Sequence, residues 1–444
     1  MTRLLRIELR RNASLVLLPV IAVLWLIWPI GPHLTQIALW GSRSMDIQGT
    51  VIALGPFAAG AGAWTAYREH RHGACDLLAT TPRAAATRGL TTLAASAVWA
   101  ALGYVAPAVV ILVITSQQAT WGHPLVLPLL DGLLAVTASS ALGFACGRLV
   151  PGRFTAPLVA VGLLGLLTLG AEAKTGHVAF VGALSPAYPS VSLDASVFFP
   201  VQPDLAVLQC AGAIGVTGAA LGATVWHAGA RRIGLAVATT GVVLVGAAAV
   251  LVSSGHRGAD NAIMVPALDS VGVRQPLPYT PVCGGTLLRV CVHPAYEVKL
   301  AVLASALNRL AAPLADTPGL PHEIDEGPIY LSQVTTTHSG VLEIPPVFIQ
   351  GDTLGPESTP VNDTTALAFV DAPGEGPAQA DDAQRAVALY LIQQAGADAG
   401  PEFIPTSPAI RAAAARLAAR SPAARHTWLA THIVAVRAGT ADLP

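Results

Sequence analysis

The chain has 444 residues, of which 53% are hydrophobic and only 11% are charged. Soluble globular proteins carry about 25% charged residues, so this composition argues against a soluble enzyme. The formal net charge of −1 gives no basis for a nucleic-acid partner. Residues 1–253 consist mainly of long apolar runs, whereas charged residues and prolines return in residues 254–444. We therefore expect an all-α polytopic membrane domain followed by a water-soluble domain.

Seven apolar runs are candidates for membrane spans, each of which needs about 20 mostly apolar residues in a helix. The spans must be helical, because lipid offers no hydrogen-bond partner to an open backbone. The first run is interpreted as a retained span, since no small-residue cleavage site follows it. The expected spans are residues 14–30, 48–67, 91–115, 125–146, 154–171, 204–226 and 233–253.

The distribution of basic residues predicts how these spans are oriented. Arginine and lysine gather on the cytoplasmic side of a membrane protein. Only Arg43 and Lys174 fall on the opposite side, so the N-terminus is expected in the cytoplasm. An odd number of spans then places residues 254–444 outside. Twelve arginines occupy the ends assigned to the cytoplasm: Arg3, Arg6, Arg10, Arg11, Arg68, Arg71, Arg83, Arg88, Arg148, Arg153, Arg231 and Arg232.

The segment after the second expected span, residues 67–83, has the sequence YREHRHGACDLLATTPR. It leaves the membrane with charged residues, becomes briefly amphipathic, and stops at Pro82 before the next span. This pattern predicts a short helix along the cytoplasmic interface, although an ordinary inner loop has similar features. His70 and His72 are interpreted as solvated interfacial residues and not as a metal site.

The same segment resembles the permease subunits of type-2 ABC exporters. These subunits carry, after their second helix, the pattern E-x-x-x-G-[TS]-[LI]-[ED]-L-L-[LA]-[ST]-x-P-[VL]-[ST]-R. Ala74, Cys75 and Arg83 depart from it. The resemblance covers residues 1–230 and includes six helices, a basic N-terminus and a longer outer loop before the sixth helix. The matching residues are Glu69, Gly73, Asp76, Leu77, Leu78, Thr80 and Pro82.

The resemblance implies a permease that is not itself an enzyme. The matching segment would dock on a separate ABC ATPase subunit, which would bind ATP and Mg²⁺, while this chain would bind no cofactor. It would form a homodimer, or a heterodimer with a related permease, in the cytoplasmic membrane of a bacterium. In keeping with this, the chain contains no GxxxxGK[ST] phosphate-binding loop. The seventh span and the outer domain depart from the six-helix family.

Two other functions remain open. The chain is alternatively a membrane-anchored sensor or assembly factor that acts through its outer domain, or an ion-coupled carrier.

Asp131 is the one carboxylate clearly inside an expected span. Carboxylates at such depth mark substrate or proton paths, or form hydrogen bonds with a neighbouring helix. We therefore expect Asp131 first to form a hydrogen bond with a neighbouring helix, and we keep it as the candidate residue of a translocation path.

The outer domain is predicted to be α+β. Its apolar stripe at Leu300, Leu303, Leu307 and Leu310 indicates a helix that ends before Pro313. No HExxH or GxSxG motif is present, so no reaction is indicated. The expected elements are strands 287–293, 329–336 and 341–350, a loop over 371–382, and helices 295–312, 381–395, 408–420 and 422–437.

Cys283 and Cys291 lie close together in this outer domain. A location outside the cell permits them to form a disulfide. The alternatives are two unrelated thiols, or a zinc site that adds His293 but lacks a fourth ligand. We expect the disulfide and no metal.

Overall fold

The computed structural model describes two compact parts of the chain. The N-terminal unit comprises Met1–Leu34 and Ala38–Gln275, and the C-terminal unit comprises Thr35–Ile37 and Pro276–Pro444. The described residues are 2–12, 37–73, 84–171, 182–188, 197–198, 203–257, 263–268, 277–278, 280–326, 335–336, 340–344, 363–370, 380–396 and 407–444.

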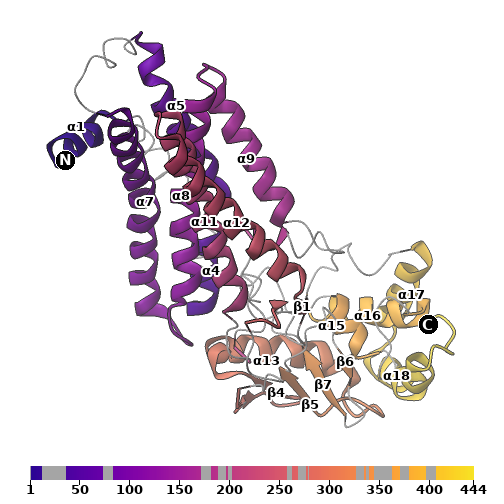
Figure 1. The fold of residues 1–444 in the computed structure, drawn as a ribbon. Helices are drawn as coiled ribbons and strands as arrows, with labels where there is room; N and C mark the ends of the chain where they lie inside the picture. Colours follow the sequence, from indigo (N-terminus) through magenta and orange to yellow (C-terminus); the bar gives the residue numbers. More distant parts are fainter. Residues whose placement is uncertain are drawn as a thin grey trace. The chain divides into compact units, whose positions relative to one another are not determined.

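The N-terminal unit is a helical bundle (Figure 1). Within the described residues, four helices are long and apolar enough to cross a membrane, namely α7, α8, α11 and α12. They agree with the expected spans 91–115, 125–146, 204–226 and 233–253. The helices of the unit are α1 (Thr2–Arg11), α4 (Trp40–Gly49), α5 (Val51–Arg71), α7 (Ala85–Gln118), α8 (Val126–Leu149), α9 (Thr155–Ala171), α11 (Asp204–His227) and α12 (Arg231–Ser253).

The other expected spans differ from these four. The span expected at 48–67 corresponds to α5, which is helical but contains several glycines and a charged last turn. The span expected at 154–171 corresponds to α9, which is apolar but shorter than the four long helices. The run at 14–30 lies outside the described residues. Four of the seven predicted spans are thus found as helices long and apolar enough to cross a membrane, and the total of seven stays a prediction.

Glycines bring the bundle helices into close contact. Gly143 and Gly147 of α8 face the backbone of α5, where an added Cβ would overlap the carbonyl groups of Ala59 and Ala63. Gly222 of α11 meets the backbone of α12 in the same way. Small residues allow helix backbones to approach closely, which is how helices associate in lipid. Glycines at these positions therefore determine where the helices of this unit make their closest backbone contacts.

The outward faces of α9 and α12 are apolar. Seven of their leucines and valines are 62% to 75% exposed. Apolar helix faces as exposed as these are unusual on a soluble monomer and are what a bilayer would cover. The residues are Leu158, Val161, Leu166, Leu169, Val242, Val243 and Val250.

The chain folds back on the bundle after α12. Strands β1 (His256–Arg257) and β2 (Ile263–Met264) pair in antiparallel fashion. The backbone N–H of Val265 then donates to Asp204 Oδ2 at the start of α11, at 2.9 Å. These residues belong to the N-terminal unit, which extends to Gln275.

The C-terminal unit contains a five-stranded sheet in the order β3-β4-β5-β7-β6, with helices packed on it (Figure 1). Strands β4, β5 and β7 are parallel, while β3 and β6 run antiparallel at the two edges. Helix α13 connects β4 to β5, as parallel neighbours require. The strands are β3 (Val282–Gly284), β4 (Arg289–Val292), β5 (Glu323–Glu326), β6 (Thr335–Thr336) and β7 (Val341–Ile344); the α-helices are α13 (Glu297–Ala311), α15 (Asp363–Ala368), α16 (Asp382–Gln394), α17 (Pro408–Ala419) and α18 (Pro422–Arg437).

The observed elements confirm the α+β prediction and shift its details. The four expected helices agree with α13, α16, α17 and α18. Ser407 and Ser421 cap α17 and α18, each with a proline at the first helical position. Strand β5 was not expected, because its sequence Glu-Ile-Asp-Glu has one apolar residue among three carboxylates. The remainder of the strands expected at 329–336 and 341–350 lies outside the described residues.

We predict that Gly143→Leu destabilises the bundle. The new side chain would occupy the position of the Ala59 carbonyl, and overpacking of this kind costs about 1–3 kcal/mol. Gly162→Leu on α9 is the matched control, because no described atom lies within 4 Å of a Cβ added there. Thermal unfolding in detergent, followed by tryptophan fluorescence, should show a lower midpoint for Gly143→Leu alone. Equal midpoints for the two variants would contradict the close α5–α8 contact.

Candidate functional site

Helix α1 is attached to the last turn of α5 and to the first half of α7. Arg68 near the end of α5 forms an ion pair with Glu8, with 2.9 Å between Nη2 and Oε2. The indole N–H of Trp99 donates to the carbonyl of Leu9 at 2.9 Å, and Asn12 Nδ2 donates to Ser96 Oγ at 3.0 Å. These contacts attach a basic, amphipathic N-terminal helix beside the point where α5 leaves the bundle.

The predicted coupling segment begins at this end of α5. Glu69 lies in the last turn of α5, and its side chain is not among those described. Gly73 follows that helix with a φ of +61°, so it supplies the left-handed residue that commonly ends a helix. Its N–H donates to the carbonyl of His70 at 3.1 Å. The structure thereby gives Gly73 a local role that its position in the motif did not indicate.

The other residues of the motif, Asp76, Leu77, Leu78 and Pro82, lie outside the described residues. The assignment of this segment to an ATPase contact therefore stays a prediction. What the described residues add is its setting, because the two helices that flank it, α5 and α7, both contact α1 and each other.

Asp131 lies inside the bundle, fully buried on α8. Gln48 of α4 donates from Nε2 to Asp131 Oδ2 at 2.8 Å and to Gln209 Oε1 of α11 at 3.1 Å. The expected hydrogen bond to a neighbouring helix is thus confirmed. The other carboxylate oxygen, Oδ1, is buried without a hydrogen-bond partner. We call Asp131, Gln48 and Gln209 the buried polar chain.

The buried polar chain continues into a loop of the N-terminal unit. Gln209 Nε2 lies 2.8, 3.0 and 3.1 Å from the carbonyl oxygens of Ala183, Ser185 and Tyr188. Polar groups inside an apolar bundle are costly unless they are hydrogen-bonded, so these contacts hold three helices and a loop in one arrangement. This is a positioning role. The assignment of Asp131 to a translocation path stays a prediction.

Sequence reasoning did not identify Gln48 and Gln209 as partners of Asp131. Each is a single amide within or beside an apolar run, and that isolation is the signal that was available. Their mutual contact depends on how α4, α8 and α11 pack, which a one-dimensional pattern does not contain.

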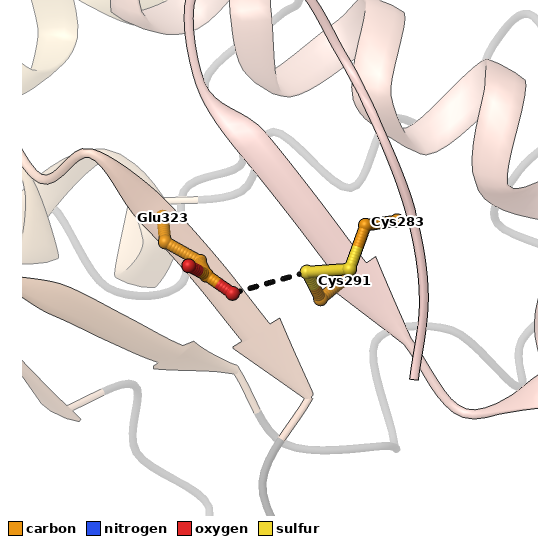
Figure 2. A group of neighbouring side chains, drawn as sticks. All are labelled: Cys283, Cys291 and Glu323. Atoms are coloured by element: carbon orange, nitrogen blue, oxygen red, sulfur yellow. Dashed lines mark hydrogen bonds between the residues drawn. A yellow bond between two sulfur atoms is a disulfide. The ribbon is translucent and has the colours of Figure 1, made fainter. Parts of the chain in front are cut away.

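The predicted disulfide is present in the C-terminal unit. Cys283 on β3 and Cys291 on β4 are directly opposite in the ladder, with 4.1 Å between their Cα atoms. Figure 2 shows Glu323 on β5 at the far side of Cys291, with its Oε1 atom 3.1 Å from Cys291 Sγ. The ligand atoms of these three residues lie within 4.8 Å of one another. The sulfur–sulfur bond occupies both thiols, so the bridged pair does not serve as a metal ligand set.

His293 does not join the two cysteines in a zinc site. Its Nδ1 atom accepts a hydrogen bond from the N–H of Ala295 at 3.1 Å, and the residue is buried. Burial lowers the pKa of His293 to about 4, so its imidazole is neutral near pH 7. Its position at the end of β4 instead brings its backbone to Glu326.

Glu326 is a second buried carboxyl, to which the sequence assigned no role. It ends β5, is fully buried, and accepts a hydrogen bond at Oε2 from the N–H of His293 at 2.6 Å. Its Oε1 atom has no hydrogen-bond partner. Burial raises the pKa of Glu326 to about 8, although the His293 hydrogen bond opposes this shift. A largely protonated carboxyl thus lies at the carboxyl ends of two parallel strands.

Comparison of the chain with protein-family models, with curated proteins and with solved structures finds no match to any of them.

We predict that the bridge is recovered without reduction. Trypsin cleaves after Arg274, Arg289 and Lys299, so the two cysteines fall in different peptides, 275–289 and 290–299. Mass spectrometry of alkylated, non-reduced protein should find these peptides joined, and reduction should separate them. Replacing both cysteines by serine should lower stability by about 2–3 kcal/mol in the chain-entropy model. Alkylated Cys283 and Cys291 peptides without reductant would refute the bridge.

The raised pKa of Glu326 predicts a pH dependence of stability. Between about pH 4.5 and pH 8 the unfolded chain has lost this proton while the folded chain keeps it. Stability from Glu326 is therefore fully present below its ordinary pKa and is lost as the pH rises through about 8. His293 acts in the opposite direction, because its contribution is lost as the pH falls from about 6.5 to 4.

Glu326→Gln isolates the first of these effects. The variant cannot ionise at this position, so wild type should lose stability relative to it by up to about 1.4 kcal/mol per pH unit between pH 4.5 and 8. Hydrogen exchange at β5 amides, corrected for intrinsic rates, measures this difference. Glu297→Gln, at an exposed position, is the control. A constant difference between wild type and Glu326→Gln across the interval would show that Glu326 ionises normally.

Proposed function

We propose that the chain is the membrane-spanning permease subunit of an ABC exporter. It moves a substrate across the bacterial cytoplasmic membrane, using ATP that a separate subunit hydrolyses with Mg²⁺. The observation that carries the proposal is the motif of residues 69–82, which lies between α5 and α7. Those two helices are held together with α1 at the end where the motif begins.

The placement of basic residues supports the proposed orientation. Arg68, Arg88, Arg148 and Arg231 lie at the helix ends that face the same side of the bundle as α1. Positive charge of this kind marks the cytoplasmic side. Helix α12 starts on this side and ends on the other, so the C-terminal unit is assigned to the outside. Its disulfide suits an oxidising compartment.

Contacts at either side of residues 13–36 support an additional crossing. Asn12 binds Ser96 near the basic ends of α5 and α7. The carbonyl of Ala38 accepts from the N–H of Thr120, which follows the opposite end of α7. We propose that residues 13–36 contain the first expected span, which would join these two positions.

The proposed mechanism uses the stiffness of the bundle. An ATPase that pulls on residues 69–82 displaces α5 and α7, between which the segment lies. Close glycine contacts couple α5 to α8, so the two helices move together. Asp131 lies on α8, and the motion would change its alignment with Gln48 and Gln209. A dimer of permeases would open a path between its protomers through this motion.

We predict that Leu77→Glu with Leu78→Glu removes the ATPase from the purified chain. Two carboxylates would replace the apolar contact surface of the proposed coupling helix, and retention should fall at least tenfold, or about 1.4 kcal/mol. Affinity purification of the tagged full-length chain with quantitative mass spectrometry of ABC ATPases provides the measurement. His72→Ala, at an exposed residue of the same region, should retain the ATPase.

The proposal is contradicted if the wild-type chain retains no ABC ATPase even after crosslinking from Cys75. It is also contradicted if the leucine double variant retains as much ATPase as wild type. The first outcome would favour the sensor or assembly factor, whose working part is the C-terminal unit.

A further inference from the structure

Strand β3 forms one edge of the sheet in the C-terminal unit, with β4 as its single neighbour among the described strands. It is only three residues long, and Gly285 turns the chain away from it with a φ of +111°. The disulfide joins this short edge strand to β4. A covalent bond thus secures an edge that its own ladder would hold weakly.

The spacing of the bridged pair shows where the backbone of Cys283 points. Facing residues of an antiparallel ladder lie about 5.5 Å apart when they exchange hydrogen bonds and about 4.5 Å apart when they do not. The Cα atoms of Cys283 and Cys291 are 4.1 Å apart, so they belong to the second kind. The N–H and C=O of Cys283 therefore point away from β4, toward the open edge. Among the described residues, no hydrogen bond reaches either group from outside the β3–β4 ladder.

A groove of about 830 Å³ lies at the end of this edge strand, between β3 with its following turn and α13. Gly284 faces Leu300 of α13, since a Cβ added there would lie 3.5 Å from that side chain, in van der Waals contact. The helix side is formed largely by Leu300, Ala301 and Ala304. The wall that these α13 residues form is apolar, and it lies next to a backbone that offers a donor and an acceptor.

We propose that this groove binds an extended peptide, which adds a strand to the open edge of β3. An unpaired edge offers its donors and acceptors at every second residue, and only an extended backbone matches that spacing. Alternate side chains of the added strand would point toward α13 and enter the groove. The small residues at positions 301 and 304 fit β-branched or short apolar side chains. This proposal is independent of the exporter function.

The charges along the groove define the peptide further. Glu297 lines it near the start of α13, and Arg309 lines it near the end. The two positions are separated by about 18 Å along the helix, at 1.5 Å per residue. An extended chain covers this distance in about six residues, at about 3.3 Å each. The expected ligand is therefore a peptide of about that length, with apolar alternate positions, a basic residue near Glu297 and an acidic one near Arg309.

The test uses two fluorescent peptides, Asp-Thr-Val-Thr-Val-Thr-Lys and Lys-Thr-Val-Thr-Val-Thr-Asp, and the full-length chain in lipid nanodiscs. Fluorescence anisotropy should show that the peptides bind to the chain, and one of the two, with either Asp or Lys at its N-terminus, should bind more tightly. Each peptide is also prepared with N-methyl groups on its valine amides or on its threonine amides. Only one of these two sets can face β3, so one pattern should abolish binding and the other should preserve it.

Two variants of α13 provide a matched pair. Ala301→Phe fills the groove and should weaken binding at least tenfold, whereas Val298→Phe, exposed outside the groove lining, should change it less than twofold. Both positions are exposed, and thermal unfolding verifies that both variants fold. The proposal is overturned if no peptide binds with a Kd below about 1 mM, or if the two methylation patterns weaken binding equally. It is also overturned if Ala301→Phe and Val298→Phe change peptide affinity by the same factor.

Discussion

The close approach of α5 to α8 is the constraint on which the N-terminal unit depends. Gly62, Gly143 and Gly147 leave no room for side chains between α5 and α8, so the two backbones meet directly. Apolar attraction between helices is weak in lipid, and packing together with polar contacts must supply the specificity. The buried polar chain adds that second component, because Gln48 of α4 reaches Asp131 of α8 and Gln209 of α11 only when these three helices pack together.

Apolar helices were the most predictable part of the chain, because a span needs only length and composition. Helices α7, α8, α11 and α12 all appear where their apolar runs predicted them. Hydrogen-bond partners on different helices were harder to predict, since nothing in the sequence near Asp131 indicates Gln209. Strand β5 was missed for another reason: Glu326 is a carboxyl at a core position, and a pattern of apolar residues does not register it.

The disulfide was predictable because it depends on compartment and proximity in sequence, while Glu326 and His293 were not, because their contact requires two parallel strands to be neighbours. Their arrangement also has a physical cost. Two ionisable groups are held in a buried setting that favours their uncharged forms, at a point where the sheet ends. Buried groups with strongly shifted pKa values are more frequent at functional sites than elsewhere, although structural networks contain them too.

The disulfide and the open edge of β3 follow from one register. A bridge between facing strands is easiest where the residues do not exchange hydrogen bonds, because only there do the Cα atoms come close enough. On an edge strand, that same residue directs its N–H and C=O outward. Cys283 therefore attaches β3 to β4 through its side chain and, through its backbone, offers a hydrogen-bond donor and acceptor at the sheet edge. A shift of the β3–β4 register by one residue would turn the N–H and C=O of Cys283 toward β4. The disulfide geometry and the outward-facing donor and acceptor would then both be lost.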